Sequence, residues 1–159
     1  MPEQVEMEVQ QAVQPRNVVD LNGVFRFKVD SKGRVALPAK FRKVLSKDLV
    51  VTLELKDECV YVFETPDFND WVHKLFVDKF GEYKESDRMH VRLRSKLKAR
   101  ANDVEVDASG RIILSAEIRA AAGIDKEVVI VGDTGRFEIW DAKRYEQVDA
   151  EIDLGLFYS

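Results

Sequence analysis

The residues best suited to chemistry are two arginines that follow the same turn signature at two places in the chain. The segment Asp30-Ser31-Lys32-Gly33-Arg34 returns 77 positions later as Asp107-Ala108-Ser109-Gly110-Arg111. Asp hydrogen-bonds the backbone that follows it and Gly accepts positive φ, so we interpret Asp30, Gly33, Asp107 and Gly110 as structural turn residues. A turn does not require arginine, whose planar guanidinium matches phosphate oxygens and guanine edges. Arg34 and Arg111 are therefore candidate DNA contacts, and an ion pair to the preceding aspartate is the alternative for each.

Basic residues around the first of these turns are further candidate DNA contacts. With Arg34, they occupy seven positions that together carry +7, the other six being Arg26, Lys28, Lys32, Lys40, Arg42 and Lys43. The equivalent positions 77 residues later carry −1, and they are Asp103, Glu105, Ser109, Arg111, Glu117, Arg119 and Ala120. Because phosphate contacts supply much of protein–DNA affinity, we expect the first set to face DNA and Arg34→Ala to weaken binding much more than Arg111→Ala. Plain solvated charge is the alternative for five residues of the first set, Lys28, Lys32, Lys40, Arg42 and Lys43.

Other kinds of chemistry have no recognisable motif in the sequence. His73 and His90 lack partners at metal-ligand spacing, so we expect no metal site. Neither a glycine-rich phosphate loop nor a nucleophile motif is present, and Cys59 is the only cysteine. We expect no catalytic residue, no cofactor and no small-molecule substrate, although paired carboxylates stay open at this stage.

Charge is unevenly distributed along the chain, whose net charge is −4. Residues 26–47 contain eight bases and one acid, and residues 88–100 contain six bases and no acid. Phosphate responds to such patches within a Debye length rather than to net charge. No apolar run reaches the length of a membrane span and the first twenty residues do not have the pattern of a signal peptide, so we expect a cytoplasmic protein without a membrane partner.

Hydrophobic periodicity predicts the same elements around both turns. A strand with Phe25, Phe27 and Val29 on one face leads into the first turn, and a helix that opens near Pro38 follows it. Strands at 49–55 and 59–64 close this copy. The second copy is expected to repeat the pattern, with Ser115 as a helix cap and a closing hairpin at 128–131 and 136–140. The repeat runs without a gap, which places Val51 on Val128 and Leu53 on Ile130.

Two helices are expected between the copies, and a third after the second copy, at 142–152. The first, Thr65–Phe80, has a stripe of aromatic and aliphatic residues that predicts a core position for Phe68 and Trp71. The second spans 88–100, where Leu93 and Leu97 favour a helix although the even-spaced bases also fit a strand. Its basic face has two open interpretations, a second DNA patch or a contact with an acidic face of another subunit. Both helices offer more apolar surface than a small barrel needs, which predicts a homo-oligomer.

The order strand, Asp-x-x-Gly-Arg turn, strand, short helix and hairpin resembles the AbrB-type swapped-hairpin DNA-binding unit. Two such units separated by a helical pair resemble the MraZ family over residues 21–146. The resemblance rests on Gly23 seven residues before Asp30, Ala101 six residues before Asp107, and the runs DSKGRVALPAKFR, GRIIL and VVIVGDTGRFEIWD. The first twenty residues are extra, and Ser115 stands where the family usually has proline.

The resemblance implies an α+β fold, a duplicated AbrB-like swapped-hairpin β-barrel with short helices and a helical pair between the repeats. The expected divisions are a disordered extension at 1–20, a first copy at 21–66, a helical connector at 67–101, a second copy at 102–146 and a tail at 147–159. It also implies a nucleoid-associated, non-enzymatic ring whose partners are double-stranded DNA and further copies of the chain. This ring would bind short direct repeats upstream of its own operon and repress the division and cell-wall gene cluster.

Two alternatives belong to the class of protein-interaction modules. One is an AbrB-type antitoxin, although the duplication counts against it because those chains usually dimerise a single copy. The other is an oligomeric scaffold that does not bind DNA. A gel shift with the DNA upstream of the protein's own gene separates both from the regulator.

Overall fold

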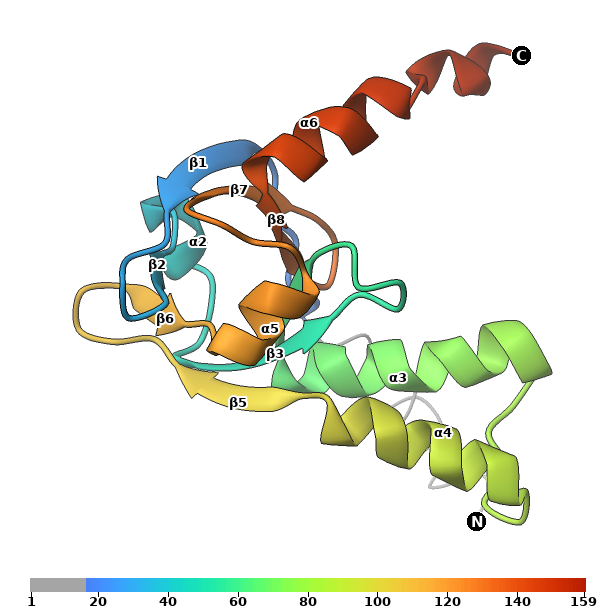
Figure 1. Cartoon of the computed structure of the whole chain (residues 1–159). Helices are drawn as coiled ribbons and strands as arrows, with labels where there is room; N and C mark the ends of the chain where they lie inside the picture. The colour runs from blue at the N-terminus through green and yellow to red at the C-terminus, as the bar shows by residue number, and fades with distance from the viewer. Residues whose placement is uncertain (1–16) are drawn as a thin grey trace, which may run out of the picture.

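A computed structural model describes residues 17–159 and shows strands wound into a barrel from which helices project (Figure 1). The strands are β1 (Val24–Lys28), β2 (Arg34–Ala36), β3 (Asp48–Leu53), β4 (Val60–Glu64), β5 (Asn102–Glu105), β6 (Arg111–Ile113), β7 (Glu127–Gly132) and β8 (Phe137–Asp141). The helices are α2 (Ala39–Arg42), α3 (Thr65–Phe80), α4 (Arg88–Ala99), α5 (Ala116–Ala121), α6 (Ala142–Glu151) and the 3-10 helix η1 (Leu154–Tyr158). The predicted α+β class and the helical assignment of 88–100 are confirmed.

The strands of the two copies interleave throughout the barrel. A six-stranded antiparallel sheet has the order β1-β7-β8-β4-β3-β5, and β2 pairs with β6 in a separate ribbon. Only the β3–β4 and β7–β8 pairings lie within one copy, whereas β1–β7, β3–β5, β4–β8 and β2–β6 all join the first copy to the second. Neither copy can therefore satisfy its backbone or bury its apolar face alone, as expected of a swapped hairpin.

Two of these pairings display the internal symmetry of the chain. In the ribbon, Val35 pairs with Ile112, the residue 77 positions later, so the symmetry axis passes between them. In the sheet, Val62 pairs with Phe137 and Val60 with Ile139, again exchanging positions 77 apart. The repeat predicted from the sequence is thus a structural repeat in these strands.

The ungapped repeat is wrong for β3 and β7, which correspond with an offset of 79 rather than 77. Lys28 of β1 pairs with Glu127, whereas Glu105 of β5 pairs with Asp48, so Asp48 is equivalent to Glu127. Val51 therefore corresponds to Ile130 and not to Val128. The second copy has two more residues before β7 and two fewer in the turn between β7 and β8. Side chains alternate with a period of two along a strand, so a shift of two residues leaves the apolar pattern in phase. The hydrophobic pattern of the sequence therefore cannot reveal the shift.

Two apolar clusters hold the molecule together. The first fills the barrel, with fully buried Val35, Phe41, Ile112 and Phe137 among its members. The second joins the outer face of β3 and β4 to α3 through Val50, Phe63, Phe68, Val72 and Phe76. The α3 helix ends at Gly81, whose φ is 84°, and the Asp87 side chain caps α4 by accepting from the amides of Met89 and His90.

Some local expectations differ from the structure. The spacing of Phe41, Val44 and Leu45 predicts one apolar face for the first copy's helix. In the structure only Phe41 of α2 is buried, and Val44 is 55% exposed because the chain leaves α2 before reaching it. The extension expected to end at residue 20 is already attached at its last residues: Val19 is buried, its amide donates to Asp67 Oδ2, and Asp20 bridges to Thr134. Residues 1–16, expected to be a mobile tail, lie outside the described residues. The predicted boundaries at 66 and 146 fall inside α3 and α6.

The two turns are held by reciprocal contacts between the copies. The Leu114 amide donates to Gly33 O at 2.8 Å, and the Leu37 amide donates to Gly110 O at 2.9 Å. Both glycines have positive φ, 81° and 77°. A methyl group on Gly33 would lie 2.5 Å from Leu114 O, well inside van der Waals contact. Gly33 is thus required twice, by its backbone conformation and by the close approach of the Leu114 carbonyl, whereas the atoms nearest a methyl group on Gly110 belong to the flexible side chain of Arg42.

We expect Gly33→Ala to reduce the free energy of unfolding by roughly 3 kcal/mol, because strain at positive φ adds to the clash with Leu114 O. Gly81→Ala is the matched control: its φ is 84°, but a methyl group there would meet nothing within 4 Å. That control should lose only about 1 kcal/mol. Chemical denaturation at one fixed chain concentration measures both, and equal losses would show that the close approach is unimportant.

Candidate nucleic-acid interface

The two turns, Asp30–Arg34 (the first turn) and Asp107–Arg111 (the second turn), have the same hydrogen bonds. The first aspartate accepts through Oδ1 from the amides of Lys32 and Arg34, at 3.0 and 2.9 Å. In the second turn, the equivalent Asp107 accepts through Oδ1 from the amides of Ser109 and Arg111, both at 2.9 Å. In each turn the glycine amide donates to the aspartate carbonyl. Different residues between Asp and Gly are therefore compatible with one backbone shape.

Each aspartate also orients the arginine of its turn. Arg34 Nε donates to Asp30 Oδ2 at 2.6 Å, and Arg111 Nε donates to Asp107 Oδ2 at 3.0 Å. The ion pair considered as the alternative to DNA contact is thus present in both turns. It uses only Nε, and no residue of 17–159 accepts a hydrogen bond from the Nη atoms of either arginine. With side chains 30% and 32% exposed, both guanidinium groups stay available to an external acceptor.

The pKa values of Asp30 and Asp107 lie below their usual range. The largest cause in each case is the hydrogen bond from the backbone amide of the arginine four residues later, which favours the ionised carboxylate. The arginine side chain adds to this effect. Both carboxylates are therefore ionised at neutral pH and keep the two arginines oriented.

Each turn lies beside the short helix of the other copy and not beside its own. Between Gly33 and Leu37 the extended chain rises about 3.3 Å per residue, which carries α2 roughly 13 Å away from the first turn. It arrives at the second turn, where Leu37 bonds to Gly110 and a methyl group on Gly110 would overlap Arg42 Cδ. By symmetry α5 arrives at the first turn, where Arg119 lies against Gly33 and donates to Leu114 O at 3.1 Å.

The expectation that the seven bases of the first copy gather around one turn is therefore wrong. Lys40, Arg42 and Lys43 belong to the second turn in space, while Glu117, Arg119 and Ala120 belong to the first. Regrouped in this way, the seven positions at the first turn contain five bases and one acid, or +4. Those at the second turn contain four bases and two acids, or +2. The contrast of +7 and −1 read along the chain becomes a difference of two charges, because the swap redistributes the helices.

The candidate bases do not all have the same freedom. Lys28, Lys32, Lys40 and Lys43 are exposed and form no ion pair with any residue of 17–159. Arg26 is held at 2.6 Å by Glu146 of α6, and both side chains remain more than half exposed. Arg42 packs over Gly110, so part of its role is structural. Its equivalent Arg119 has the same role at Gly33 and was not selected from sequence, although the 77-residue repeat pairs the two.

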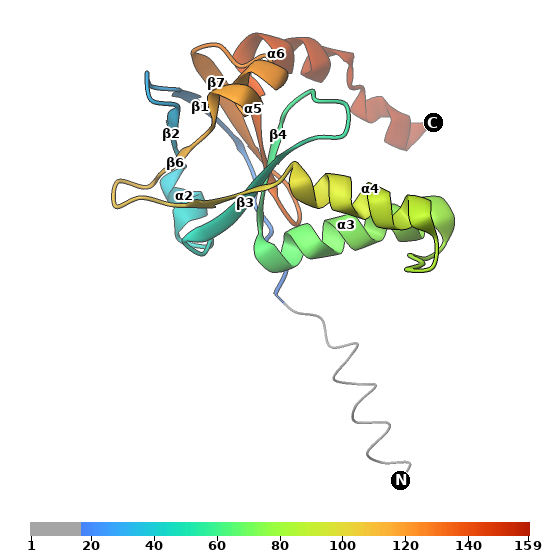
Figure 2. The same cartoon turned by 60° about the horizontal axis from the view of Figure 1, so that its bottom comes forward.

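Both turns lie on one side of the barrel, and α3, α4 and the C-terminal helices lie on the opposite side. This separation holds in two views (Figure 1, Figure 2). An extended ligand such as a DNA duplex can therefore reach both arginines without meeting the long helices.

Within the described chain, His90 and the aromatic residues considered from the sequence have structural roles. His90 is buried, and its Nδ1 accepts from the Lys84 amide at 3.0 Å, as in a satisfied core histidine. Phe68 and Trp140 are buried and Trp71 is partly buried against Phe63 and Phe68, so base stacking on these rings is not available. Within residues 17–159 no group of three His, Cys, Asp or Glu side chains is arranged to hold a metal ion, and no helix is long and apolar enough to cross a membrane.

Comparison with known proteins agrees with the duplicated architecture. A family model described as "MraZ protein, putative antitoxin-like" matches residues 21–92 and 97–157, which together include both turns and both hairpins. The chain belongs to the MraZ family. Three relatives are each named Transcriptional regulator MraZ. The protein of Idiomarina loihiensis is 34% identical over 137 residues, covering 83% of this chain and 87% of the relative.

The other two relatives have similar identity and coverage. That of Saccharopolyspora erythraea is 40% identical over 124 residues, with 78% of this chain and 82% of the relative covered. That of Alcanivorax borkumensis is 31% identical over 129 residues, with 79% and 85% covered. The MraZ match begins at Leu21, just after the attached residues Val19 and Asp20.

We expect Asp30→Asn combined with Asp107→Asn to flatten the loss of stability in acid. The pKa of each carboxylate is lower in the folded chain than in the unfolded one, so its contribution is complete above about pH 4 and is lost as pH falls through the folded value. The double variant lacks both titrating groups. Urea midpoints at about pH 5 and about pH 3 should therefore differ less than in the unsubstituted chain. Asp103→Asn, on the strand before the second turn, is the control, and an equal flattening there would contradict the assignment.

Proposed function

We propose that this protein is a DNA-binding transcriptional regulator and that both turns contact DNA. The observation that carries the proposal is the pair of congruent turns, each presenting an aspartate-oriented arginine beside a short helix from the other copy. The names of the relatives support the regulatory role. The protein acts by binding, without catalysis.

The chemistry of the turns fits a duplex. The free Nη atoms of Arg34 and Arg111 suit phosphate oxygens or the O6 and N7 acceptors of guanine. The exposed lysines nearby, Lys28 and Lys32 at the first turn and Lys40 and Lys43 at the second, neutralise phosphates and release counterions. Lysine charge thus positions the protein, while the arginines are the groups able to discriminate bases.

The regulator assembles from several chains. It binds short direct repeats upstream of its own operon, where it lowers transcription of the division and cell-wall genes. The family resemblance supports this part of the proposal, together with the exposed apolar residues of the helical side, such as Met89, Leu93 and Phe80. In this assembly each chain forms one DNA-binding barrel from residues 21–66 and 102–146. Residues 67–101 make the contacts between chains.

Arg34→Ala and Arg111→Ala should both weaken binding to the DNA upstream of the protein's own gene. Each loss is worth about 1–3 kcal/mol for every engaged subunit, so an assembly multiplies the effect. Fluorescence anisotropy measures the affinity, and light scattering checks that the mass is unchanged. Lys74→Ala, an exposed base on α3 away from the turns, is the control. If Arg111→Ala changes the DNA affinity as little as Lys74→Ala does, only the first turn faces DNA. In that case the charge contrast along the sequence, +7 against −1, predicts the DNA-binding face better than the grouping of charges in space.

Affinity should fall steeply with salt and rise steeply with the number of DNA repeats. Each subunit on the duplex neutralises several phosphates, so the logarithm of the affinity falls linearly with the logarithm of salt concentration. Linked subunits on tandem repeats gain avidity over one subunit on one repeat. Titrations of one, two and four repeats at two salt concentrations measure both effects. Equal affinity for one repeat and for four would refute multivalent binding.

A further inference from the structure

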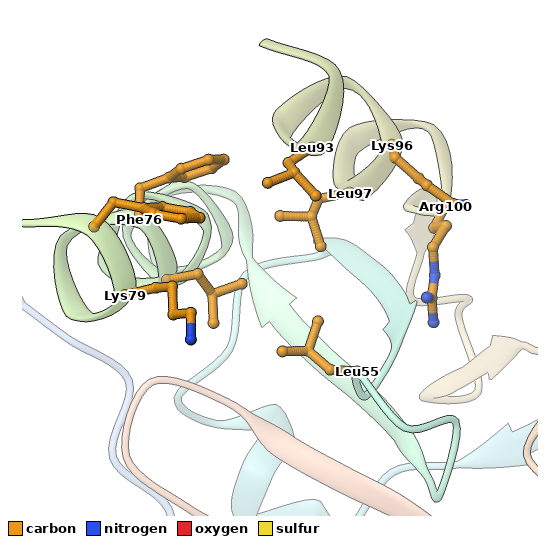
Figure 3. A pocket seen from close by; sticks show the side chains of 9 residues that line it. Leu55, Phe76, Lys79, Leu93, Lys96, Leu97 and Arg100 are labelled. Carbon is orange, nitrogen blue, oxygen red and sulfur yellow. The ribbon is translucent and has the colours of Figure 1, made fainter. Parts of the chain in front are cut away.

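An apolar groove runs between α3 and α4 on the side of the molecule away from the turns. It has a volume of about 360 Å³, and Leu55, Leu75, Phe76, Leu93 and Leu97 contribute to its lining. Figure 3 shows Leu93 and Leu97 of α4 pointing toward Leu55, with Lys79 and Arg100 on either side. Apolar residues beside or within it remain solvent-accessible, with Phe80 46% and Leu93 37% exposed. The groove is therefore apolar at its base and has bases at its rim. Arg100 is paired with Asp57 at 2.7 Å, whereas Lys79 and Lys96 form no ion pair within residues 17–159.

The C-terminal segment has the complementary properties. Ile152, Leu154, Leu156, Phe157 and Tyr158 are 63%, 70%, 76%, 87% and 93% exposed, and neither core cluster of the described chain includes them. Residues 145–159 contain four acids and no base, whereas residues 88–100, which form α4 and its cap, contain six bases and no acid. Ile152–Tyr158 itself carries one acid, Asp153, and Asp149 and Glu151 precede it on α6. The segment and the groove are therefore matched in hydrophobicity, and the charges beside them are opposite.

The segment is held away from the groove of its own chain. Arg144 near the start of α6 donates through Nη1 to the carbonyls of Asp57, Glu58 and Ala122, and Glu146 pairs with Arg26. These contacts fix the direction of α6, which carries η1 outward from the barrel and apart from α3 and α4 in two views (Figure 1, Figure 2). These contacts do not prevent the segment from reaching the groove of another chain.

We propose that the C-terminal segment, Ile152–Tyr158, of one chain docks into the α3–α4 groove of the next chain in an assembly. The contact joins two different surfaces, so it repeats head to tail and produces a ring when the rotation closes. It gives the basic face of α4 the acidic partner considered from the sequence, in place of DNA. The inference rests on the self-assembly proposed above and names the surfaces that carry it.

Disulfide trapping between two single variants tests the contact directly. Leu93→Cys chains mixed with Phe157→Cys chains under mild oxidation should give a covalent dimer that neither variant gives alone. The native Cys59 does not interfere, because it is 1% exposed and burial raises the pKa of its thiol. Val44→Cys mixed with Phe157→Cys is the control, since Val44 is 55% exposed but lies on α2's side of the barrel.

Light scattering of a charged variant is the second test. Leu156→Asp with Phe157→Asp should lower the mass to that of one chain while leaving the denaturation midpoint of the barrel nearly unchanged, because both side chains are already exposed. Val44→Asp should leave the mass unchanged.

The outcomes separate the contact from the assembly. If the unsubstituted protein has the mass of one chain, both the self-assembly and the proposed contact are wrong. DNA binding by the turns is then decided separately, by the Arg34→Ala and Arg111→Ala measurements. If the mass is a multiple but no mixed dimer forms, assembly stands and this contact is overturned. The contact is equally overturned if a Leu93→Cys, Phe157→Cys double variant closes only within one chain, or if deleting residues 1–16, rather than substituting the C-terminal segment, lowers the mass.

Discussion

Two backbone hydrogen bonds, from Leu114 to Gly33 and from Leu37 to Gly110, are the constraint on which the rest of the structure depends. They bring each turn against the other copy, most closely at Gly33, where a methyl group would lie 2.5 Å from Leu114 O, and the β2–β6 ribbon between them lies on the symmetry axis. Because every other pairing between the copies follows the same exchange, losing these contacts would separate both turns from the helices that flank them. The binding surface is therefore a property of the pair and not of either copy.

The features that sequence could predict are those set by local chemistry. Asp30 and Gly33 specify a turn in any surroundings, and Ser115 caps its helix by accepting from the Ile118 amide at 3.1 Å. The offset of β3 and β7 could not be found, because a two-residue shift preserves the alternation of buried side chains. The grouping of charges could not be found either, since it depends on which helix meets which turn, and that follows from the exchange of strands between copies.

Arg42 and Arg119 show why residue type alone does not separate structure from binding. Both are basic residues on short surface helices, yet each lies over the glycine of a turn, where a flat guanidinium fills the space that a side chain at that glycine would take. The exposed lysines beside Arg42, Lys40 and Lys43, form no such contact with any residue of 17–159. A phosphate-binding role is therefore better supported for these lysines than for Arg42, although all three arise from one basic run.

The division of the molecule into two sides explains how a barrel of this size can serve an assembly. The turns and the long helices project in opposite directions (Figure 2), so the contact proposed between chains, through α3, α4 and the C-terminal segment, would leave both turns uncovered. The proposed contact would have the same character as the barrel, in which strands of one copy complete the sheet of the other. A single turn offers one arginine and a few lysines. In the proposed function, the affinity for a defined DNA site would therefore come from repetition, twice within a chain by duplication and again between chains by the proposed assembly.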